Sequence, residues 1–151
     1  MAFEIPADLN PALTPIAWLI GRWQGNGHGN WPGVGDFEFG QRIDFATNRG
    51  PYLHYLSQTW TLDADGQPDA PLAMETGFCP EGWVEVWVGA LLGAKIELTT
   101  DLVARTDTAE LPYTGGHRLY GNVDGDLMWA FDRAATDVRL QPYMWARLQR
   151  A

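Results

Sequence analysis

The sequence has little that could crosslink the chain or hold it on a polyanion. Cys79 is the only cysteine, which excludes an intramolecular disulfide framework. Lys95 is the only lysine, and 19 acidic residues against 10 basic ones give a net charge of −9. Clustered lysine and arginine bind phosphate backbones, so this balance argues against nucleic acid and anionic membrane surfaces as partners. No base flanks Cys79 in "GFCPEG", which favours a buried or inert thiol over a nucleophile.

Long hydrophobic runs are missing as well. The stretch "MAFEIPADLNPALTPIAWLIG" has no basic region, and its longest apolar run, "IAWLI", is too short for a signal-peptide core or a membrane span. A cytoplasmic protein without a membrane span is the resulting expectation. Pro11 and Pro15 prevent one long helix, so residues 8–20 are expected to form a short helical or 3₁₀ segment.

What the sequence does contain is a series of short segments that alternate with period two. They are "FEFGQRIDF", "YLHYLSQTW", "GWVEVWVGALL", "AKIELTTDLVART" and "GDLMWAFD". Loops rich in Asp, Gly and Pro separate them, with Asp124-Gly125 as a strong hairpin signal. No βαβ rhythm is present, so we expect an all-β, antiparallel up-and-down barrel in one domain, residues 1–151, with a two-sheet sandwich as the alternative.

A row of glycines opens the first expected strand in "GRWQGNGHGNWPG". A phosphate-binding loop would have to lead into a helix, but Pro32 and Gly33 follow instead. The row therefore predicts a strand that bends sharply or lets another backbone approach closely. Trp23 lies between these glycines as a single large side chain.

The spacing Gly21-x-Trp23-x-Gly25-x-Gly27 resembles the GxWxGxG signature of the nitrobindins. These are haem-binding calycin barrels, also described as fatty-acid-binding-protein-like. Further segments resemble the family in order and spacing, from about Pro15 to Arg150: "GPYLHYLSQTW", "PLAMETGF" and "LQPYMWARLQR". The resemblance implies a barrel of about ten strands whose N-terminal segment helps to close one end.

The last segment departs from that family. The family holds haem through a histidine in a pattern like Q-P-H-L-x-A-R-L, and here "QPYMWARL" has Tyr143 at that position. Other positions that correspond to the family's pocket are substituted too: Gly33, Leu72, Ala73 and Arg133. A phenol must lose its proton to ligate iron, which ferric iron can drive and ferrous iron drives poorly. We expect Tyr143 to pack as an aromatic side chain, with ferric-haem ligation as the alternative.

Period two puts Tyr143, Trp145 and Arg147 on one face of the last strand. The resemblance suggests that this face points inward unless a bulge intervenes. It also implies a barrel-closing cation–π pair between Trp23 and Arg147, with an exposed Arg147 as the alternative. Arg133 either attracts a carboxylate at the barrel mouth or is a solvated loop arginine.

Other candidate groups carry weaker signals. His28, His54 and His117 match none of the family's ligand positions, and they are expected to be surface or hydrogen-bonded histidines. Glu75 and Glu85 lack an accompanying nucleophile, which argues against a hydrolytic site. Glu75 is expected to make a structural hydrogen bond.

Three functions fit this sequence: a haem-dependent module, a binder of a small apolar or amphipathic molecule, and a barrel filled by its own aromatic side chains. The resemblance implies nitric oxide binding, or isomerisation of peroxynitrite at ferric haem, for the first. We expect the second function, with haem binding lost or weakened and no cofactor. Haem b ligated by Tyr143 is the alternative. We lean against an enzyme, because the family's isomerase activity would require haem. The ligand's identity and the oligomeric state are left open.

Overall fold

The computed structural model describes residues 4–76, 82–107 and 112–151. The described chain forms a 3₁₀ segment and nine antiparallel strands in one sheet. The elements are η1 (Pro11–Leu19), β1 (Gly21–Trp31), β2 (Gly35–Ala46), β3 (His54–Leu62), β4 (Pro68–Glu75), β5 (Trp83–Leu92), β6 (Lys95–Arg105), β7 (Tyr113–Val123), β8 (Asp126–Ala135) and β9 (Val138–Arg150). The antiparallel all-β prediction is confirmed. The single sheet excludes the sandwich.

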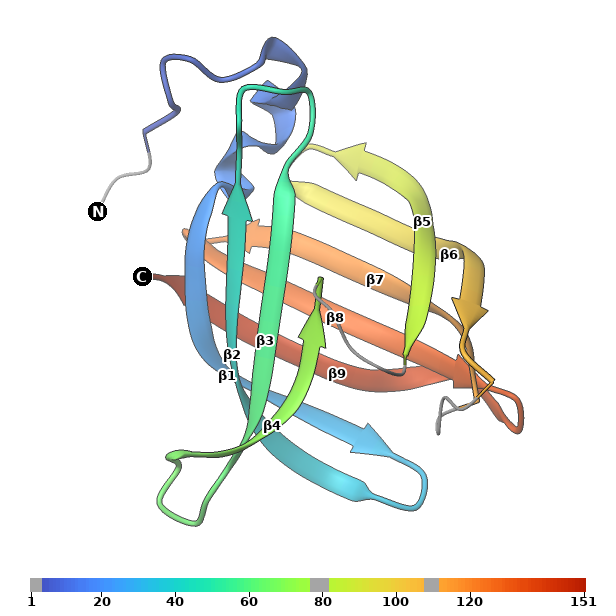
Figure 1. Cartoon of the computed structure of the whole chain (residues 1–151). Helices are drawn as coiled ribbons and strands as arrows, with labels where there is room; N and C mark the ends of the chain where they lie inside the picture. Colours follow the sequence, from blue (N-terminus) through green and yellow to red (C-terminus); the bar gives the residue numbers. More distant parts are fainter. Residues whose placement is uncertain (1–3, 77–81, 108–111) are drawn as a thin grey trace.

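The sheet is an up-and-down array whose two halves are joined by the pairing of the first strand with the last. Its order is β4-β3-β2-β1-β9-β8-β7-β6-β5, so that the first and last strands pair at the centre. Figure 1 shows how the sheet curls around an interior, with η1 beside the end where β1 begins. Among the described residues, β4 and β5 are the two edges of the sheet. Among those same residues, no helix is long and apolar enough to cross a membrane.

The glycines of β1 allow β9 to approach closely. A Cβ on Gly25 would lie 2.8 Å from the carbonyl oxygen of Arg147, and one on Gly27 would lie 2.6 Å from that of Trp145. Side chains at these positions would therefore force the two strands apart. The predicted close backbone approach is confirmed.

The N-terminal segment covers one end of the barrel. Asn10 caps η1 by accepting a hydrogen bond of 3.0 Å from the Ala12 N–H. Three apolar side chains of η1 are buried: Leu13, Ala17 and Leu19. Trp23 is fully buried below them, and its Nε1–H donates to the Leu19 carbonyl at 2.7 Å. The predicted 3₁₀ lead-in is therefore confirmed, and it contributes to this end of the core.

β9 contains a bulge at Tyr143. Phe131 of β8 pairs with Met144, and Asp132 pairs with Pro142, so Tyr143 is an extra residue in the ladder. The extra residue interrupts the alternation, and Tyr143 and Met144 both join the core. Beyond the bulge the buried side chains are Met144, Ala146 and Leu148, and the exposed ones are Trp145 and Arg147.

The cation that covers Trp23 is Arg150 rather than the expected Arg147. The guanidinium carbon of Arg150 lies 4.1 Å from the Trp23 ring centroid. Arg150 also donates hydrogen bonds to the carbonyls of Trp18 (2.8 Å) and Ile20 (2.5 Å). The predicted pair between Trp23 and Arg147 is therefore wrong and the alternative of an exposed Arg147 is confirmed, because the bulge moves the inward positions to even-numbered residues.

Candidate functional site

Tyr143 lies inside the barrel within a group of aromatic side chains. Its ring centroid is 5.2 Å from that of Trp31, 5.6 Å from Phe131 and 6.1 Å from Phe37. The first two contacts are edge-on, which is a favourable arrangement for aromatic pairs. The bulge on β9 thus directs Tyr143 into packed aromatic surroundings.

Arg133 lies beside Tyr143 and is only 3% exposed. It follows the inward alternation of β8, in which Leu127, Trp129, Phe131, Arg133 and Ala135 are all buried. Its guanidinium carbon is 4.6 Å from the ring centroid of Trp31, 4.8 Å from Tyr143, 5.5 Å from Tyr113 and 5.8 Å from Trp83. The solvated-loop alternative is wrong, because this position belongs to a strand and faces the interior.

A second arginine, Arg118 on β7, forms a complete ion pair across the interior. Both of its terminal nitrogens donate to the carboxylate of Glu75 on β4, with Nη1 at 3.0 Å from Oε2. Tyr55 donates to the same carboxylate. The Arg118 guanidinium also lies over the rings of Phe131 (4.4 Å) and Trp87 (4.9 Å). The predicted structural hydrogen bond of Glu75 is confirmed.

The protonation states of this cluster follow from burial and charge. Burial alone would raise the pKa of Glu75, but the charge of Arg118 and the hydrogen bonds from Arg118 and Tyr55 hold it below 4.5. Burial is the main reason that the pKa of Tyr55 lies well above 10, and Tyr120 and Glu75 add to the effect. At neutral pH the cluster therefore holds an ionised carboxylate beside a neutral phenol.

Glu85 on β5 is a second interior carboxylate with a different environment. The Trp83 Nε1–H and the Tyr113 hydroxyl both donate to it, the latter at 3.2 Å. Burial raises the pKa of Glu85 despite the opposing effects of Arg118 and of these two donors. Burial also raises the pKa of Tyr113 to about 12. Both carboxylates therefore accept hydrogen bonds from neighbouring side chains that hold them in place.

Comparison with known proteins identifies the family. Residues 12–150 match the family of THAP4-like, heme-binding beta-barrel domains. The chain belongs to this nitrobindin family. The match covers all nine strands, from β1 at the covered end to β9 with its bulge.

Two relatives and one solved structure are similar to this chain over nearly its whole length. A "Ferric nitrobindin-like protein" of Cutibacterium acnes is 58% identical, with 100% of both chains covered. A "Peroxynitrite isomerase" of a Nocardioides species is 46% identical over 99% of each chain. The crystal structure of Rv2717c from M. tuberculosis has a TM-score of 0.77 at 30% identity, covering 95% of this chain and 99% of that one.

Of the substituted nitrobindin pocket positions, Arg133 lies against Tyr143. The others lie elsewhere. Gly33 is exposed in the turn between β1 and β2, with a φ of 84° that favours glycine. Leu72 and Ala73 are exposed on the edge strand β4. Two of the five expected haem-pocket positions, Tyr143 and Arg133, therefore lie in contact with each other.

The histidines lie away from the Tyr143 cluster. His28 is exposed beside Glu38, and His54 is exposed at the start of β3. His117 is partly buried between Glu97 and Asp132, with its Nε2 at 3.0 Å from Glu97. Within the described parts of the chain, no group of three or more His, Cys, Asp or Glu side chains could hold a metal ion. Cys79 lies outside the described residues.

Sequence reasoning missed Arg118 and its phenolic neighbours. The available signal was the alternation of β7, where Gly116, Arg118 and Tyr120 share the inward face. A charged residue at an inward position implies a buried partner. The partner, Glu75, is far away in sequence, so only the curl of the sheet identifies it.

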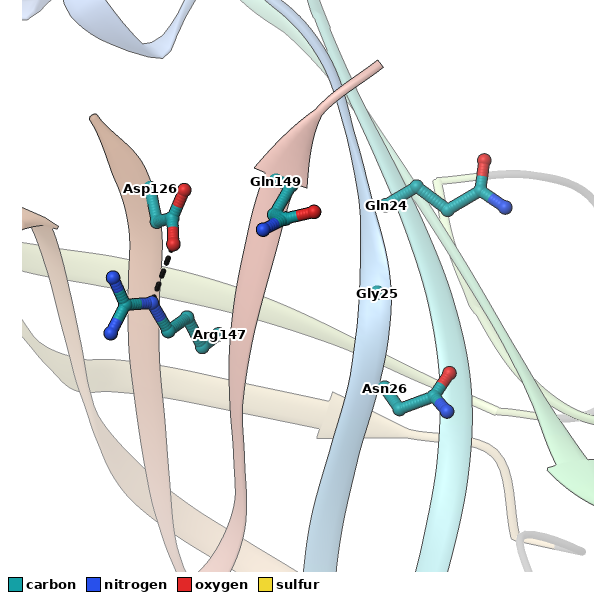
Figure 2. Close-up of a pocket in the computed structure, with 6 residues that line it drawn as sticks. All are labelled: Gln24, Gly25, Asn26, Asp126, Arg147 and Gln149. Carbon is teal, nitrogen blue, oxygen red and sulfur yellow. Dashed lines mark hydrogen bonds and ion pairs between the residues drawn. The ribbon is translucent and has the colours of Figure 1, made fainter. Parts of the chain in front are cut away.

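The outer face carries a separate shallow hollow between β1 and β9. It is lined by Gln24, Gly25, Asn26, Asp126, Arg147 and Gln149. Figure 2 shows Arg147 turned toward Asp126, with its Nε 2.5 Å from the carboxylate. The hollow contains none of the interior groups described above, and it places Arg147 on the outside of the barrel.

Proposed function

We propose that this nitrobindin-like barrel binds a small apolar or amphipathic molecule, and that its haem binding is lost or much weakened. The observation that carries the proposal is the packing of Tyr143 against Trp31, Phe131 and Arg133. A ligand oxygen must bond directly to haem iron, so a porphyrin would need the space that these side chains fill. The packing around Tyr143 therefore supports the loss of haem binding.

The interior supports binding of an amphipathic molecule better than catalysis. Aromatic rings provide most of the surface around Tyr143, while Arg133 and Arg118 provide buried charge. Glu75 and Glu85 both accept hydrogen bonds from neighbouring donors, which favours a structural role for the carboxylates. A polar head and an apolar body would find matching surroundings here.

The alternative is a ferric haem protein ligated by Tyr143. One observation favours it: the bulge on β9 turns Tyr143, which stands at the position of the family's histidine, toward the core. Bound ferric haem would supply peroxynitrite chemistry, as the name of the Nocardioides relative suggests, or the nitric oxide binding that the resemblance implies. This alternative requires the rings around Tyr143 to move.

A titration with ferric haem separates the two functions. The purified protein, Tyr143→Phe and the outward-facing control Trp145→Phe would each be titrated while the Soret band and tryptophan fluorescence are recorded. We expect no tight stoichiometric haem complex in any of the three. A pyrene-labelled dodecanoic acid should bind all three proteins at one site.

Two outcomes would change this conclusion. A tight one-to-one haem complex with a histidine-like spectrum would contradict the loss of haem binding. A complex that disappears in Tyr143→Phe and persists in Trp145→Phe would establish the alternative, since only the first variant lacks the phenol.

A further inference from the structure

Arg133 presents an unusual combination of burial and missing partners. Its Nε and Nη2 atoms are both buried, and neither has a hydrogen-bond partner among the described residues. These two nitrogens form one edge of the guanidinium, from which two parallel N–H groups point in the same direction. That edge matches the two oxygens of a carboxylate.

Arg118 shows how the same barrel satisfies a buried guanidinium. It also lies against aromatic rings, but its two terminal nitrogens bond to Glu75, and only its Nε lacks a partner. Among the residues that the structure describes, Arg133 has the aromatic surroundings without a carboxylate partner. Removing a cation from water without a paired anion is strongly unfavourable. A bound group that supplies two oxygens to the Arg133 guanidinium would therefore lower its free energy.

The surroundings decide where such an anion would lie. The Arg133 guanidinium carbon lies 4.6–5.8 Å from the ring centroids of Trp31, Tyr143, Tyr113 and Trp83, and its Nε and Nη2 make no hydrogen bond to any of the described residues. Glu85 is held by Trp83 and Tyr113 and does not bond to Arg133. Trp83 is 37% exposed, so one of the rings beside Arg133 reaches the surface of the molecule.

We infer that Arg133 is the head-group site of the barrel, and that it binds a planar oxyanion with two oxygens, a carboxylate, through Nε and Nη2. The inference rests on the proposed function, because the carboxylate is assigned to the interior ligand. The chain carries a net charge of −9, so an anion gains entry only where a local cation offsets the general repulsion. The aromatic walls then contact the apolar part that follows the carboxylate.

The test compares pyrene-labelled dodecanoic acid with its uncharged methyl ester, by fluorescence titration of the full chain. Wild type should bind the acid at least tenfold more tightly than the ester, because charge-assisted hydrogen bonds are lost with the ester. Arg133→Gln should abolish this preference, and Arg133→Lys should restore little of it, since an ammonium cannot form the two-pronged contact. Arg139→Gln, an exposed arginine on β9, is the matched control and should behave as wild type.

A second experiment distinguishes a free small oxyanion from the carboxylate of a larger apolar molecule as the group that Arg133 binds. Acetate and nitrate alone would be added to wild type and Arg133→Gln, with thermal unfolding as the readout. One outcome is that these ions stabilise wild type but not Arg133→Gln while the labelled acid binds to neither protein. That result would support the oxyanion site and contradict the proposed function. Equal binding of acid and ester by wild type would overturn the head-group site and leave the proposed function standing. Failure of all probes to bind would overturn both. The wild-type comparison decides the matter even if the variants fold poorly.

Discussion

At the scale of single residues, Arg147 and Arg150 of β9 make opposite kinds of contact. Arg147 is about half exposed and pairs with Asp126 on the outer face. Arg150 covers Trp23 and donates to two carbonyls at the end of η1. Exposed ion pairs contribute little to stability, whereas desolvated cation–π and charge-assisted contacts contribute more. Their side-chain directions, set by the bulge, decide which arginine stabilises the fold.

We predict that Arg150→Met lowers the free energy of unfolding by about 2–4 kcal/mol, through loss of the cation–π contact and two hydrogen bonds to carbonyls. Arg147→Met, the matched control on the same strand, should lower it by less than about 1 kcal/mol. Urea unfolding followed by tryptophan fluorescence measures both changes. Equal effects of the two substitutions would contradict the assignment of Arg150 as the closing cation.

At the scale of elements, period-two reasoning succeeds wherever a strand is regular. It assigned one face of β2 to Phe37, Phe39, Gln41, Ile43 and Phe45, and the structure buries that face wholly or in part. It failed on β9, because a bulge depends on the pairing with β8 and leaves no mark on the alternation itself. The structure places Tyr143 inside, as the resemblance suggested, and Arg147 on the exposed face, which was the stated alternative.

Gly27→Ala tests the close approach of β1 and β9. A Cβ at Gly27 would meet the Phe39 ring, and it would lie 2.6 Å from the Trp145 carbonyl and 2.8 Å from the Ala146 Cβ. Since neither backbone can withdraw without breaking the ladder, we predict a loss of about 1–3 kcal/mol in the free energy of unfolding. Asn26→Ala, an outward substitution on the same strand, should change stability by less than about 0.5 kcal/mol. A fully stable Gly27→Ala variant would show that the strands are not tightly apposed there.

At the scale of the whole molecule, the candidate site assembles strands that are distant in sequence. Trp31 ends β1, Arg133 lies on β8 and Tyr143 lies on β9, and their side chains meet because β1 pairs with β9. The antiparallel array could be predicted from local alternation and turn residues. The curl that brings Glu75 to Arg118 could not, because it depends on twist accumulated over the whole sheet. The sequence therefore predicted the fold better than the interior ion pair.

The distribution of stability across the sheet should follow its topology. Each of the edge strands β4 and β5 pairs on one side only among the described residues, and most of their side chains are exposed. β1 and β9 have partners on both sides and contribute Trp23 and Leu148, which are fully buried. Local opening is easiest where few buried contacts resist it.

We therefore predict that the backbone amides of β4 and β5 exchange with deuterium much faster than those of β1, β8 and β9. Hydrogen-exchange mass spectrometry of the free protein measures the order. Protection of β4 and β5 equal to that of β1 would contradict the open edges and would mean that these strands are paired in solution. The edge strands could then be paired between two copies of the chain or with each other within one barrel. Repeating the measurement at high dilution distinguishes these two cases, because pairing between copies weakens on dilution whereas closure of one barrel does not.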